Sequence, residues 1–543
     1  MSASKLQKSE VRIKHSLNKD EEDFVVNRRK SVFPTLGNLE AHCNQDVVKN
    51  IALLGSGGGQ RAMVGLLGSL VQLDKAGLLK YIIYLSGVSG STWCMASLYQ
   101  EPDWSTKLLT VTKKIIKRLI GPPVSWEDAL AKLKKYYYEK DIFSLTDVWA
   151  TIVVTTYVKE IDEGKLSEQW DQYSKDPFPI YTVIESCGCF LSQTWFEISP
   201  YEAGYSLTGA FVGTSSFGSQ FEKGSMIKQQ PEMDMLYLQA LCSSALADEE
   251  EICKFIWQKK KVSSCLFIVF SSKDPNDPPA EKCCQVLMDL VDMNLDVLNG
   301  KDPSAYDRSI RKTLKELAEG KGQLIFPVGK LDLADKEAAK QYMEQYTTDV
   351  CNYLSSCFSF WPFDVCISIY TCIAQWIWGR KYNFFHNMTD ETVPDALLEG
   401  ETRDYEDAAL LLNSPYFSVL RDERDIDLII SLDFSEGDPF MTLTQTAEMC
   451  KKQKIHFPDV PVFPEEEKKN PKDFYMFTGQ NAPTVIHMPL FNVVNCGDDI
   501  EAWRKKYCIF QGPYSAEMIT DLMEAAGKNI SNNRERLKEQ IST

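Results

Sequence analysis

Histidine is scarce in this chain, which has only five among its 543 residues. Nucleophilic hydroxyl and thiol groups need a base, and a nearby histidine is a common one. A histidine-based mechanism therefore has few possible partners in this sequence, namely His15, His42, His386, His456 and His487.

Cysteines with the spacing of zinc ligands are absent, although the chain contains 16 cysteines. They are scattered without a C-x-x-C pair, and the close pairs Cys187/Cys189 and Cys283/Cys284 do not match zinc-site spacing. No EF-hand loop pattern occurs either. We therefore expect no metal and no cofactor. The polar N-terminus has no apolar segment typical of a secretory signal, so we expect a cytoplasmic protein with reduced thiols.

Positive charge is not in excess, since the formal net charge is −17. This balance argues against nucleic acid as the main partner and against broad electrostatic adhesion to acidic membranes, although local basic patches remain compatible with it. An apolar content of 44% and a charged content of 25% are typical of globular proteins. With 543 residues the chain could hold about three or four domains of average size, although α/β enzymes often exceed that average size.

Long apolar runs are also rare, and the one that occurs is Phe358–Trp378. A membrane-spanning helix needs about 20 apolar residues with few charges. This run is interrupted by Pro362, Asp364 and Gln375, so we expect a buried or lid helix. Its many aromatic residues would also suit a membrane interface.

Glycine, in contrast, is concentrated in the stretch Lys49–Leu98. The apolar run Ile51–Leu54 predicts a buried strand, and four of the five residues in Gly55–Gly59 are glycines. Arg61–Leu79 has apolar residues at helical spacing, and Tyr81–Leu85 predicts a second buried strand. A sharp turn then leads into a helix. The predicted order is strand, glycine loop, helix, strand, turn and helix.

The turn after the second strand reads Gly87-Val88-Ser89-Gly90-Ser91 and is typical of a nucleophile elbow. Its glycines permit a sharp bend that exposes the Ser89 hydroxyl at the carboxyl edge of the sheet. The N–H groups of the glycine loop, at the same edge, could stabilise an oxyanion. Arg61, in the first turn of the next helix, could bind a phosphate.

Two other functions of a glycine-rich loop fit this stretch less well. A dinucleotide fingerprint is incomplete, since the loop offers only Gly57-x-Gly59-x-x-Ala62 and the second strand ends without a ribose-binding acid. A P-loop is excluded because no Gly-Lys-Ser/Thr follows. We therefore favour an oxyanion loop beside a nucleophilic serine, although the elbow's fifth residue is Ser91 and not glycine.

The order of residues in the sequence does not decide which base would activate Ser89. The order Ser89, Asp407, His487 would satisfy a hydrolase triad. His487 lies within an apolar strand-like run, however, where a buried structural histidine is the more common situation. The alternative is an aspartate that accepts the serine proton directly.

The remaining segments predict further elements. Trp104–Ile120 could be a basic amphipathic helix that lies on a membrane, although we favour an ordinary surface helix with its apolar stripe packed inward. We expect a long loop with short elements at 195–224, a loop with one short element at 405–420, and a polar C-terminal helix at 516–541. Further helices are expected at 144–159, 235–246 and 442–452, and strands within 178–198 and at 265–270, 428–432 and 483–491.

Several motifs together closely resemble the group IV cytosolic phospholipases A2, most of all their gamma branch. The resemblance extends from about Ile51 to Trp503, with a gap over 248–376. The motifs are GSGGGQRAMVG from Gly55, GVSGSTW from Gly87, SLTDVWA from Ser144, WFEISPYEAG from Trp195, FGSQFEKG from Phe217, WGRKYNFF from Trp378, DAALLLNSPYF from Asp407, SLDFSEGDPF from Ser431 and HMPLFNVVNCGDDIEAW from His487.

The resemblance implies an α/β fold: a three-layer patatin-like catalytic domain with a mixed central sheet and a cap or lid. It implies that residues 48–530 form this domain, with a variable cap at about 248–376, after an N-terminal arm at 1–47 and before a tail at 531–543. Ser89 matches the nucleophile and Asp407 the base of a Ser-Asp dyad. Gly58 and Gly59 match the oxyanion hole, and Arg61 matches the arginine that binds the lipid phosphate.

The implied activity is hydrolysis of glycerophospholipid acyl esters through an acyl-serine, as a phospholipase A2 with possible lysophospholipase or transacylase activity. The implied partners are an acyl phospholipid and the surface of intracellular membranes, bound peripherally and transiently. Two alternatives are a broad serine esterase with a Ser-Asp-His triad and a catalytically impaired lipid-binding member.

Three departures from the family pattern affect these expectations. The usual Asp-x-Gly at the base is Asp407-Ala408-Ala409, so the loop must avoid a positive φ at Ala409 or tolerate strain. The first 47 residues are too short for a calcium-binding β-sandwich of about 100 residues, so we expect calcium-independent activity. The chain ends in Ile541-Ser542-Thr543 without a prenylation cysteine, so we expect no lipid anchor there.

Overall fold

Two compact units make up the chain in the computed structural model. The structure describes residues 10–36, 48–170, 174–186, 194–244, 278–318, 331–497, 499–509 and 511–542. The first unit comprises Met1–Lys132, Trp149–Ala245 and Arg380–Thr543, and the second comprises Leu133–Val148 and Leu246–Gly379. The cap predicted at about 248–376 falls within the range of the second unit.

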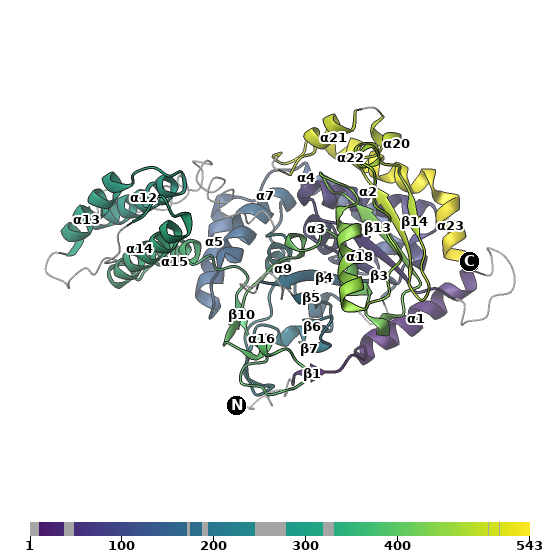
Figure 1. Cartoon of the computed structure of the whole chain (residues 1–543), viewed down its shortest axis with the longest axis horizontal. Helices are drawn as coiled ribbons and strands as arrows, with labels where there is room; N and C mark the ends of the chain where they lie inside the picture. The colour runs from purple at the N-terminus through teal and green to yellow at the C-terminus, as the bar shows by residue number, and fades with distance from the viewer. Residues whose placement is uncertain are drawn as a thin grey trace. The chain divides into compact units, whose positions relative to one another are not determined.

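A mixed 11-stranded sheet lies at the centre of the first unit (Figure 1). Five neighbouring strands run parallel, in the order β4, β3, β2, β13 and β15. Antiparallel strands β5, β6, β7 and β1 extend the sheet beyond β4, and β14 extends it beyond β15. The strands are β1 (Arg12–Ile13), β2 (Ile51–Gly55), β3 (Tyr84–Gly87), β4 (Phe178–Glu185), β5 (Thr194–Ile198), β6 (Glu202–Tyr205), β7 (Ala210–Gly213), β12 (Tyr405–Asp407), β13 (Leu428–Asp433), β14 (Tyr475–Phe477) and β15 (Thr484–Pro489).

The parallel strands match the predicted apolar runs because they are buried on both faces. β2 and β3 pair in the register Ala52 to Tyr84 and Gly55 to Gly87. β3 begins at Tyr84, later than predicted, because Leu79–Tyr81 forms a 3₁₀ turn. The carboxyl ends of these strands therefore lie at one edge of the sheet, where open α/β folds place their ligands.

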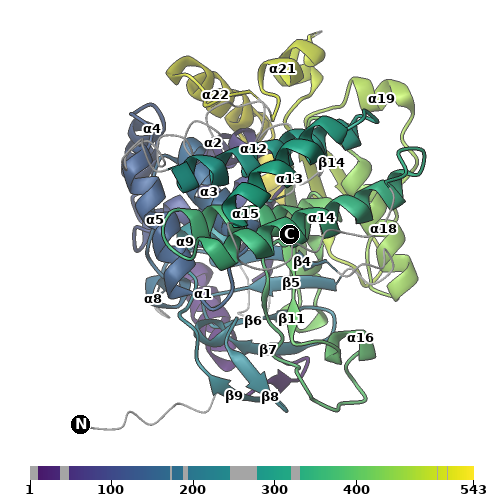
Figure 2. The same ribbon diagram turned by 90° about the vertical axis from the view of Figure 1, so that its left-hand side faces the viewer.

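Helices cover both faces of the sheet, and Figure 2 shows α4 and α18 on opposite sides of it. One face packs Ala52, Tyr84 and Ile429 against side chains of α1, α17 and α18. On the other face α2 packs against α22, so closely that a Cβ on Gly68 would lie 2.5 Å from the Met523 carbonyl oxygen. The helices of this unit include α1 (Lys19–Leu36), α2 (Gly59–Lys75), α3 (Gly90–Tyr99), α4 (Leu108–Leu119), α7 (Thr155–Val158), α8 (Leu166–Gln169), α9 (Met235–Leu241), α16 (Asp395–Leu398), α17 (Tyr416–Val419), α18 (Met441–Gln453), α19 (Glu465–Lys469), α20 (Val493–Cys496), α21 (Ile500–Lys506), α22 (Ala516–Asn532) and α23 (Arg534–Ser542).

The long loop predicted at 195–224 is wrong, because this segment forms antiparallel strands. β5, β6 and β7 continue the central sheet, and β8 (Gln220–Glu222) forms a hairpin with β9 (Ser225–Lys228). Glycine suggested a loop, yet Gly204 lies inside β6. A Cβ there would lie 2.1 Å from the Ala210 carbonyl oxygen, so glycine marks a close approach of two strands.

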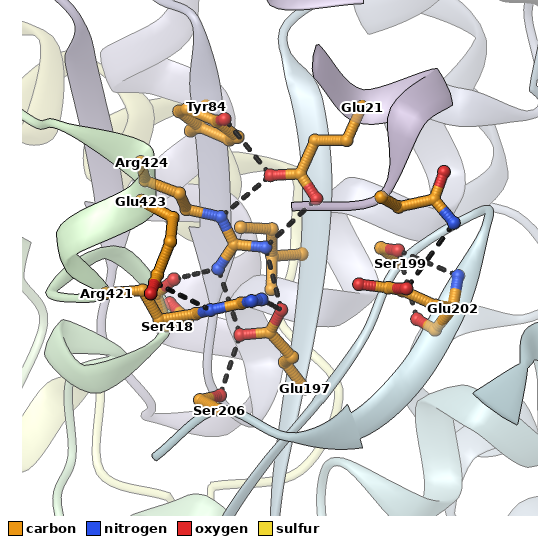
Figure 3. Close-up of polar contacts among 12 residues, drawn as sticks. Glu21, Tyr84, Glu197, Ser199, Glu202, Ser206, Ser418, Arg421, Glu423 and Arg424 are labelled. Carbon is orange, nitrogen blue, oxygen red and sulfur yellow. Dashed lines mark hydrogen bonds and ion pairs between the residues drawn. The ribbon is translucent and has the colours of Figure 1, made fainter. Parts of the chain in front are cut away.

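A buried ionic cluster joins α1, β3 and β5 to the segment that follows α17 (Figure 3). Arg424 contacts Glu21 of α1 at 2.8 Å and Glu197 of β5 at 2.7 Å. Glu197 also binds Arg421 at 3.0 Å, and the Tyr84 hydroxyl donates to Glu21 at 3.0 Å. Although burial acts against ionisation, the two arginines hold the pKa of Glu197 at about 2. The cluster therefore fixes the first helix and the Arg421–Arg424 segment to the sheet.

The second unit is a group of helices with its own apolar core. Leu290, Ile310, Tyr346, Leu354 and Ile367 are all buried in that core. Its helices are α6 (Leu145–Val148), α12 (Pro278–Leu298), α13 (Ser304–Ala318), α14 (Lys336–Cys357) and α15 (Phe363–Ala374). The run Phe358–Trp378 thus contains a partly buried helix, as predicted. Within the described ranges, no helix is long and apolar enough to cross a membrane.

Two of the predicted helices are divided into shorter elements in the structure. The helix predicted at 144–159 is present as α6, a π-helical stretch (Trp149–Val154) and α7. The C-terminal helix is divided into α22 and α23, and Leu537 and Ile541 of the predicted tail are buried. The structure also has the helix α5 (Trp126–Glu139) and the paired strands β10 (Lys381–Tyr382) and β11 (Thr402–Arg403). The loop around Cys187 and the predicted strand at 265–270 lie outside the described residues.

Candidate active site

Ser89 occupies a sharp turn between β3 and α3, as the elbow motif predicts. Its backbone angles are φ 52° and ψ −124°, in a region that serine rarely adopts. The Ser89 carbonyl accepts the Thr92 N–H at 2.9 Å, which begins the helix immediately. Gly90 is required here, because a Cβ would lie 1.8 Å from the Gly59 carbonyl oxygen. The turn therefore stores backbone strain and presents a serine at the carboxyl edge of β3.

The glycine loop lies directly against this turn. The Val88 N–H donates to the Gly55 carbonyl at 3.1 Å, and the Ser91 hydroxyl donates to the Ser56 carbonyl at 2.6 Å. A Cβ built on Gly57 would lie 3.0 Å from the Ser89 Cβ. The two motifs, about 30 residues apart in the sequence, thus form one continuous surface around the serine.

Gly58 and Gly59 form the N-terminus of α2, with φ values of 147° and 55°. Both conformations favour glycine. The first N–H groups of a helix lack partners within the helix and carry the positive end of its dipole. These two residues therefore have the conformation and position of a loop that can donate hydrogen bonds to an anion.

Asp407 reaches the same edge of the sheet from β12. β4 pairs with β3 over Phe178–Tyr181, and then with β12 over Val183–Glu185, while β5 occupies its other edge. β12 therefore pairs with the same edge of β4 as β3 does, further along that strand. Asp407 is paired with Val183 of β4. Gly87 is paired with Tyr181, two residues earlier in β4, so the two pairs are roughly 7 Å apart along that strand. Ser89 also lies two residues beyond Gly87, so both residues lie just past the end of β3.

The Asp407 carboxylate is fully buried and held by local contacts. Its Oδ1 accepts the Ala409 N–H at 2.8 Å, and its own N–H donates to the Ser244 hydroxyl at 3.2 Å. Ala408–Leu410 is a 3₁₀ turn in which Ala409 does not have a positive φ. The loop thus avoids the strain that alanine in place of glycine could have caused. Burial and the Asp407 charge raise the pKa of the Cys242 thiol, so that cysteine remains protonated.

Asn413 links the aspartate segment to the glycine loop, a role that sequence reasoning missed. Its carbonyl accepts the Gly57 N–H at 3.0 Å, and its Nδ2 donates to the Gly57 carbonyl at 3.4 Å. Nδ2 also donates to the Ser435 hydroxyl at 2.9 Å. The only signal in the sequence was its place within the motif that begins at Asp407.

Arg61 is buried at the start of α2 and has several protein partners. Nε donates to the Phe434 carbonyl at 2.7 Å, and Nη1 donates to the Tyr507 carbonyl at 2.6 Å. Nη1 also forms an ion pair with Glu436 at 3.2 Å. Nη2 lies beside the oxyanion loop, 3.0 Å from where a Cβ on Gly58 would lie. The guanidinium therefore has a structural role and also places one nitrogen at the loop.

His487 lies on β15, three strand intervals from β3. At about 4.8 Å per interval this separates the two strands by roughly 14 Å. Its Nε2 is 2.8 Å from the Pro439 carbonyl, and no hydrogen-bond partner of Nδ1 occurs among the described residues. Burial lowers the pKa of His487. The sheet thus separates this histidine from Ser89, which disfavours the triad alternative.

Among the residues that the structure describes, no group of three or more His, Cys, Asp or Glu side chains is arranged to hold a metal ion.

Comparison with known proteins identifies the family and supports the fold. The family model of the lysophospholipase catalytic domain matches residues 51–248. The cytosolic phospholipase A2 gamma of Mus musculus is 31% identical over 95% of this chain and 90% of its own length, and that of Homo sapiens is 30% identical over 98% and 96%. The solved structure of human GIVD cytosolic phospholipase A2 superposes with a TM-score of 0.67 at 20% identity, over 98% of this chain and 68% of that chain, which supports the α/β fold. The chain therefore belongs to the cytosolic phospholipase A2 family, whose members are hydrolases of phospholipid acyl esters.

Proposed function

We propose that the hydrolysis of the acyl ester uses Ser89 as nucleophile and Asp407 as general base, without a histidine. The observation that carries this proposal is the strand register, which places both residues just beyond the end of β3. The distance between β3 and β15 supports the exclusion of His487.

The reaction proceeds in two steps. Asp407 accepts the proton of the Ser89 hydroxyl while its oxygen attacks the acyl carbonyl, and the resulting oxyanion accepts hydrogen bonds from the N–H groups of Gly58 and Gly59. Collapse breaks the ester C–O bond, and Asp407 returns the proton to the departing lysophospholipid alkoxide. In the second step Asp407 takes a proton from water, which attacks the acyl-serine, and the fatty acid leaves as Ser89 regains its proton.

Arg61 is proposed to hold the substrate phosphate through Nη2, the guanidinium nitrogen beside Gly58. Its other contacts keep the side chain in place before substrate binds. A lysophospholipid could bind in the same way, and an acyl-serine can transfer its acyl group to an alcohol in place of water. We therefore propose lysophospholipase and transacylase side activities at the same serine.

The substrate resides in a bilayer, so we propose a cytoplasmic enzyme that associates transiently with the surface of intracellular membranes. We also propose that activity does not require calcium. The sequence contains no EF-hand loop pattern. Hydrolysis of liposomes at equal rates with and without a calcium chelator is the expected result, and a loss of most of the rate on chelation would contradict it.

The test of the nucleophile uses a fluorophosphonate probe, which reacts with activated serines. Wild-type protein should be labelled, and Ser89→Ala should lose both labelling and ester hydrolysis with little change in melting temperature. Undiminished turnover in Ser89→Ala would reject the assignment. Absence of labelling and turnover in folded wild-type protein would instead support a catalytically impaired lipid-binding protein.

A further inference from the structure

Helix α4 has two apolar stripes, and only one of them is buried. Leu108, Val111, Ile115 and Leu119 face the interior, which confirms the inward-packed stripe predicted from the sequence.

The second stripe consists of Leu109, Ile116 and Ile120. Leu109 is 51% exposed and Ile120 is 49% exposed, while Ile116 is half-buried. At about 100° per residue these three positions fall within an arc of roughly 40°, well away from the buried stripe. Three apolar side chains thus lie in a row along a helix face that the first unit does not cover.

Two lysines border this stripe. Lys113 lies about 20° beyond the edge of this arc and Lys117 about 60° beyond it. The other cations of the helix are paired, since Lys114 binds Glu101 and Arg118 binds Glu160. Neither Lys113 nor Lys117 has an ion pair with any residue that the structure describes. α4 itself contains no acidic residue.

The helix α4 packs beside α3, the helix that begins directly after Ser89. Gly121, next in the chain, accepts a hydrogen bond from Lys159 at the end of α7, at 2.8 Å. Tyr157 of α7 stacks on Trp93 at a ring distance of 6.0 Å. Trp93 lies about one turn after Ser89 in α3. Figure 2 shows α4 along the outer side of the first unit, beside α3.

We propose that the exposed face of α4, formed by Leu109, Lys113, Ile116, Lys117 and Ile120, docks on an anionic phospholipid bilayer. The proposal rests on the proposed action of the enzyme at a membrane surface. Helices that bind in the interfacial plane combine an apolar stripe with lysines in this way. Trp126, soon after α4, is 42% exposed, and tryptophan is a common residue at membrane interfaces.

Charge identifies the kind of membrane. The whole chain has a net charge of −17 and is repelled by anionic surfaces at long range. The α4 face carries two cations and no carboxylate, so it is the complement of an anionic lipid surface. A lysine close to such a surface contributes about fivefold to binding, so two lysines together contribute about 25-fold.

The experiment measures binding of the full chain to vesicles of ether-linked phosphatidylcholine, with and without ether-linked phosphatidylserine, which the enzyme cannot hydrolyse. Lys113→Gln/Lys117→Gln should lower binding to the phosphatidylserine vesicles about 25-fold and remove most of its salt dependence. Leu109→Ser/Ile120→Ser should lower binding to both kinds of vesicle. The matched control is Lys451→Gln/Lys452→Gln, which removes two exposed lysines from the last turn of α18, and it should bind like wild type.

Hydrolysis of a short-chain monomeric ester separates this proposal from the mechanism. Both α4 variants should hydrolyse that ester within about twofold of wild type, because the helix face does not touch the reacting groups. If the wild-type protein does not hydrolyse the monomeric ester, the proposed mechanism is rejected. The vesicle-binding data then still decide whether α4 docks on the membrane. Docking by α4 is overturned if the α4 variants bind vesicles like wild type, if the α18 control loses binding equally, or if the α4 variants change the association state of the protein but not its vesicle binding.

Discussion

Gly57 approaches Ser89 so closely that a Cβ on Gly57 would lie 3.0 Å from the Ser89 Cβ. The same Cβ would lie 2.4 Å from Oδ1 of Asn413, so neither side of the loop has space for a methyl group. The glycine loop and the nucleophile elbow are thus positioned by direct contact, and the position of one sets the position of the other.

Gly57→Ala should therefore displace the oxyanion loop from Ser89. Because loss of one oxyanion donor or a misplacement of about 1 Å costs roughly 100-fold, we expect kcat to fall by about that factor. Steady-state hydrolysis of a monomeric ester measures the effect. Gly437→Ala is the matched control, since no atom lies within 4 Å of its added Cβ, and it should retain activity. Equal activity of Gly57→Ala and wild type would show that the contact is unimportant.

Asp407→Asn should lower turnover by several orders of magnitude, because an amide cannot accept the serine proton. His487→Gln should have a much smaller effect, since β2 and β13 separate its strand from β3. Rates of ester hydrolysis and melting curves of both variants check this. An active Asp407→Asn variant beside an inactive but folded His487→Gln variant would reverse the assignment.

The local pattern around Ser89 was predictable because it depends on short-range rules. Apolar runs ending in glycine indicated β2 and β3, and the Gly-x-Ser-Gly turn indicated the elbow. The family resemblance supplied Asp407. Nothing in spacing alone could bring that residue to Ser89, because their proximity depends on β4 changing its partner from β3 to β12.

The antiparallel strands β5 to β7 were missed for a related reason. Gly204 and its neighbours have loop-like composition, but pairing with strands distant in sequence decides their conformation. The buried cluster of Glu21, Glu197 and Arg424 was equally inaccessible, since its members lie far apart in the chain. Charged residues are usually exposed, and only the fold shows these to be buried and paired.

Ala409 gives a third prediction, because its N–H holds the Asp407 carboxylate at 2.8 Å. Ala409→Gly keeps this donor and should alter stability by no more than about 1 kcal/mol, with activity close to wild type. Ala409→Pro removes the N–H and should lower kcat at least tenfold while the protein still folds. Kinetics and melting curves of the two variants measure the difference. Similar kcat values for both would show that this hydrogen bond does not position the base.

Glu197 gives a prediction on acid stability. Its folded pKa of about 2 lies below the value of about 4.3 expected in the unfolded chain. The carboxylate therefore contributes stability that is fully present above about pH 4.3 and is lost as the pH falls toward 2.

Glu197→Gln removes the buried carboxylate that pairs with Arg421 and Arg424, although Arg424 keeps its ion pair with Glu21. The variant should therefore lower the free energy of unfolding by about 3–5 kcal/mol at neutral pH. The difference from wild type should shrink as the pH falls from about 4.3 toward 2. Urea unfolding at a series of pH values measures it. The exposed Glu465→Gln serves as control and should show no such difference, and a constant gap between Glu197→Gln and wild type at all pH values would refute the argument.

Arg61 gives the last prediction, in which a structural and a binding role can be separated. Arg61→Ala removes the donors to the Phe434 and Tyr507 carbonyls, and because those acceptors are buried, it should lower the melting temperature by several degrees. If Nη2 also binds phosphate, phospholipid hydrolysis should fall more than tenfold further than hydrolysis of a small uncharged ester, since a charge-assisted hydrogen bond contributes about 1.5–3 kcal/mol.

The control for the ion pair is Glu436→Gln. This variant removes the Glu436 charge but leaves the Phe434 and Tyr507 contacts of Arg61 intact. It should keep the melting temperature near that of wild type and should not lower the ratio of phospholipid to ester hydrolysis, because Nη2 stays in place. The ratio in Arg61→Ala decides the question: if both substrates lose activity equally, Arg61 acts only by holding α2 to the Phe434 and Tyr507 segments, and the phosphate must bind elsewhere.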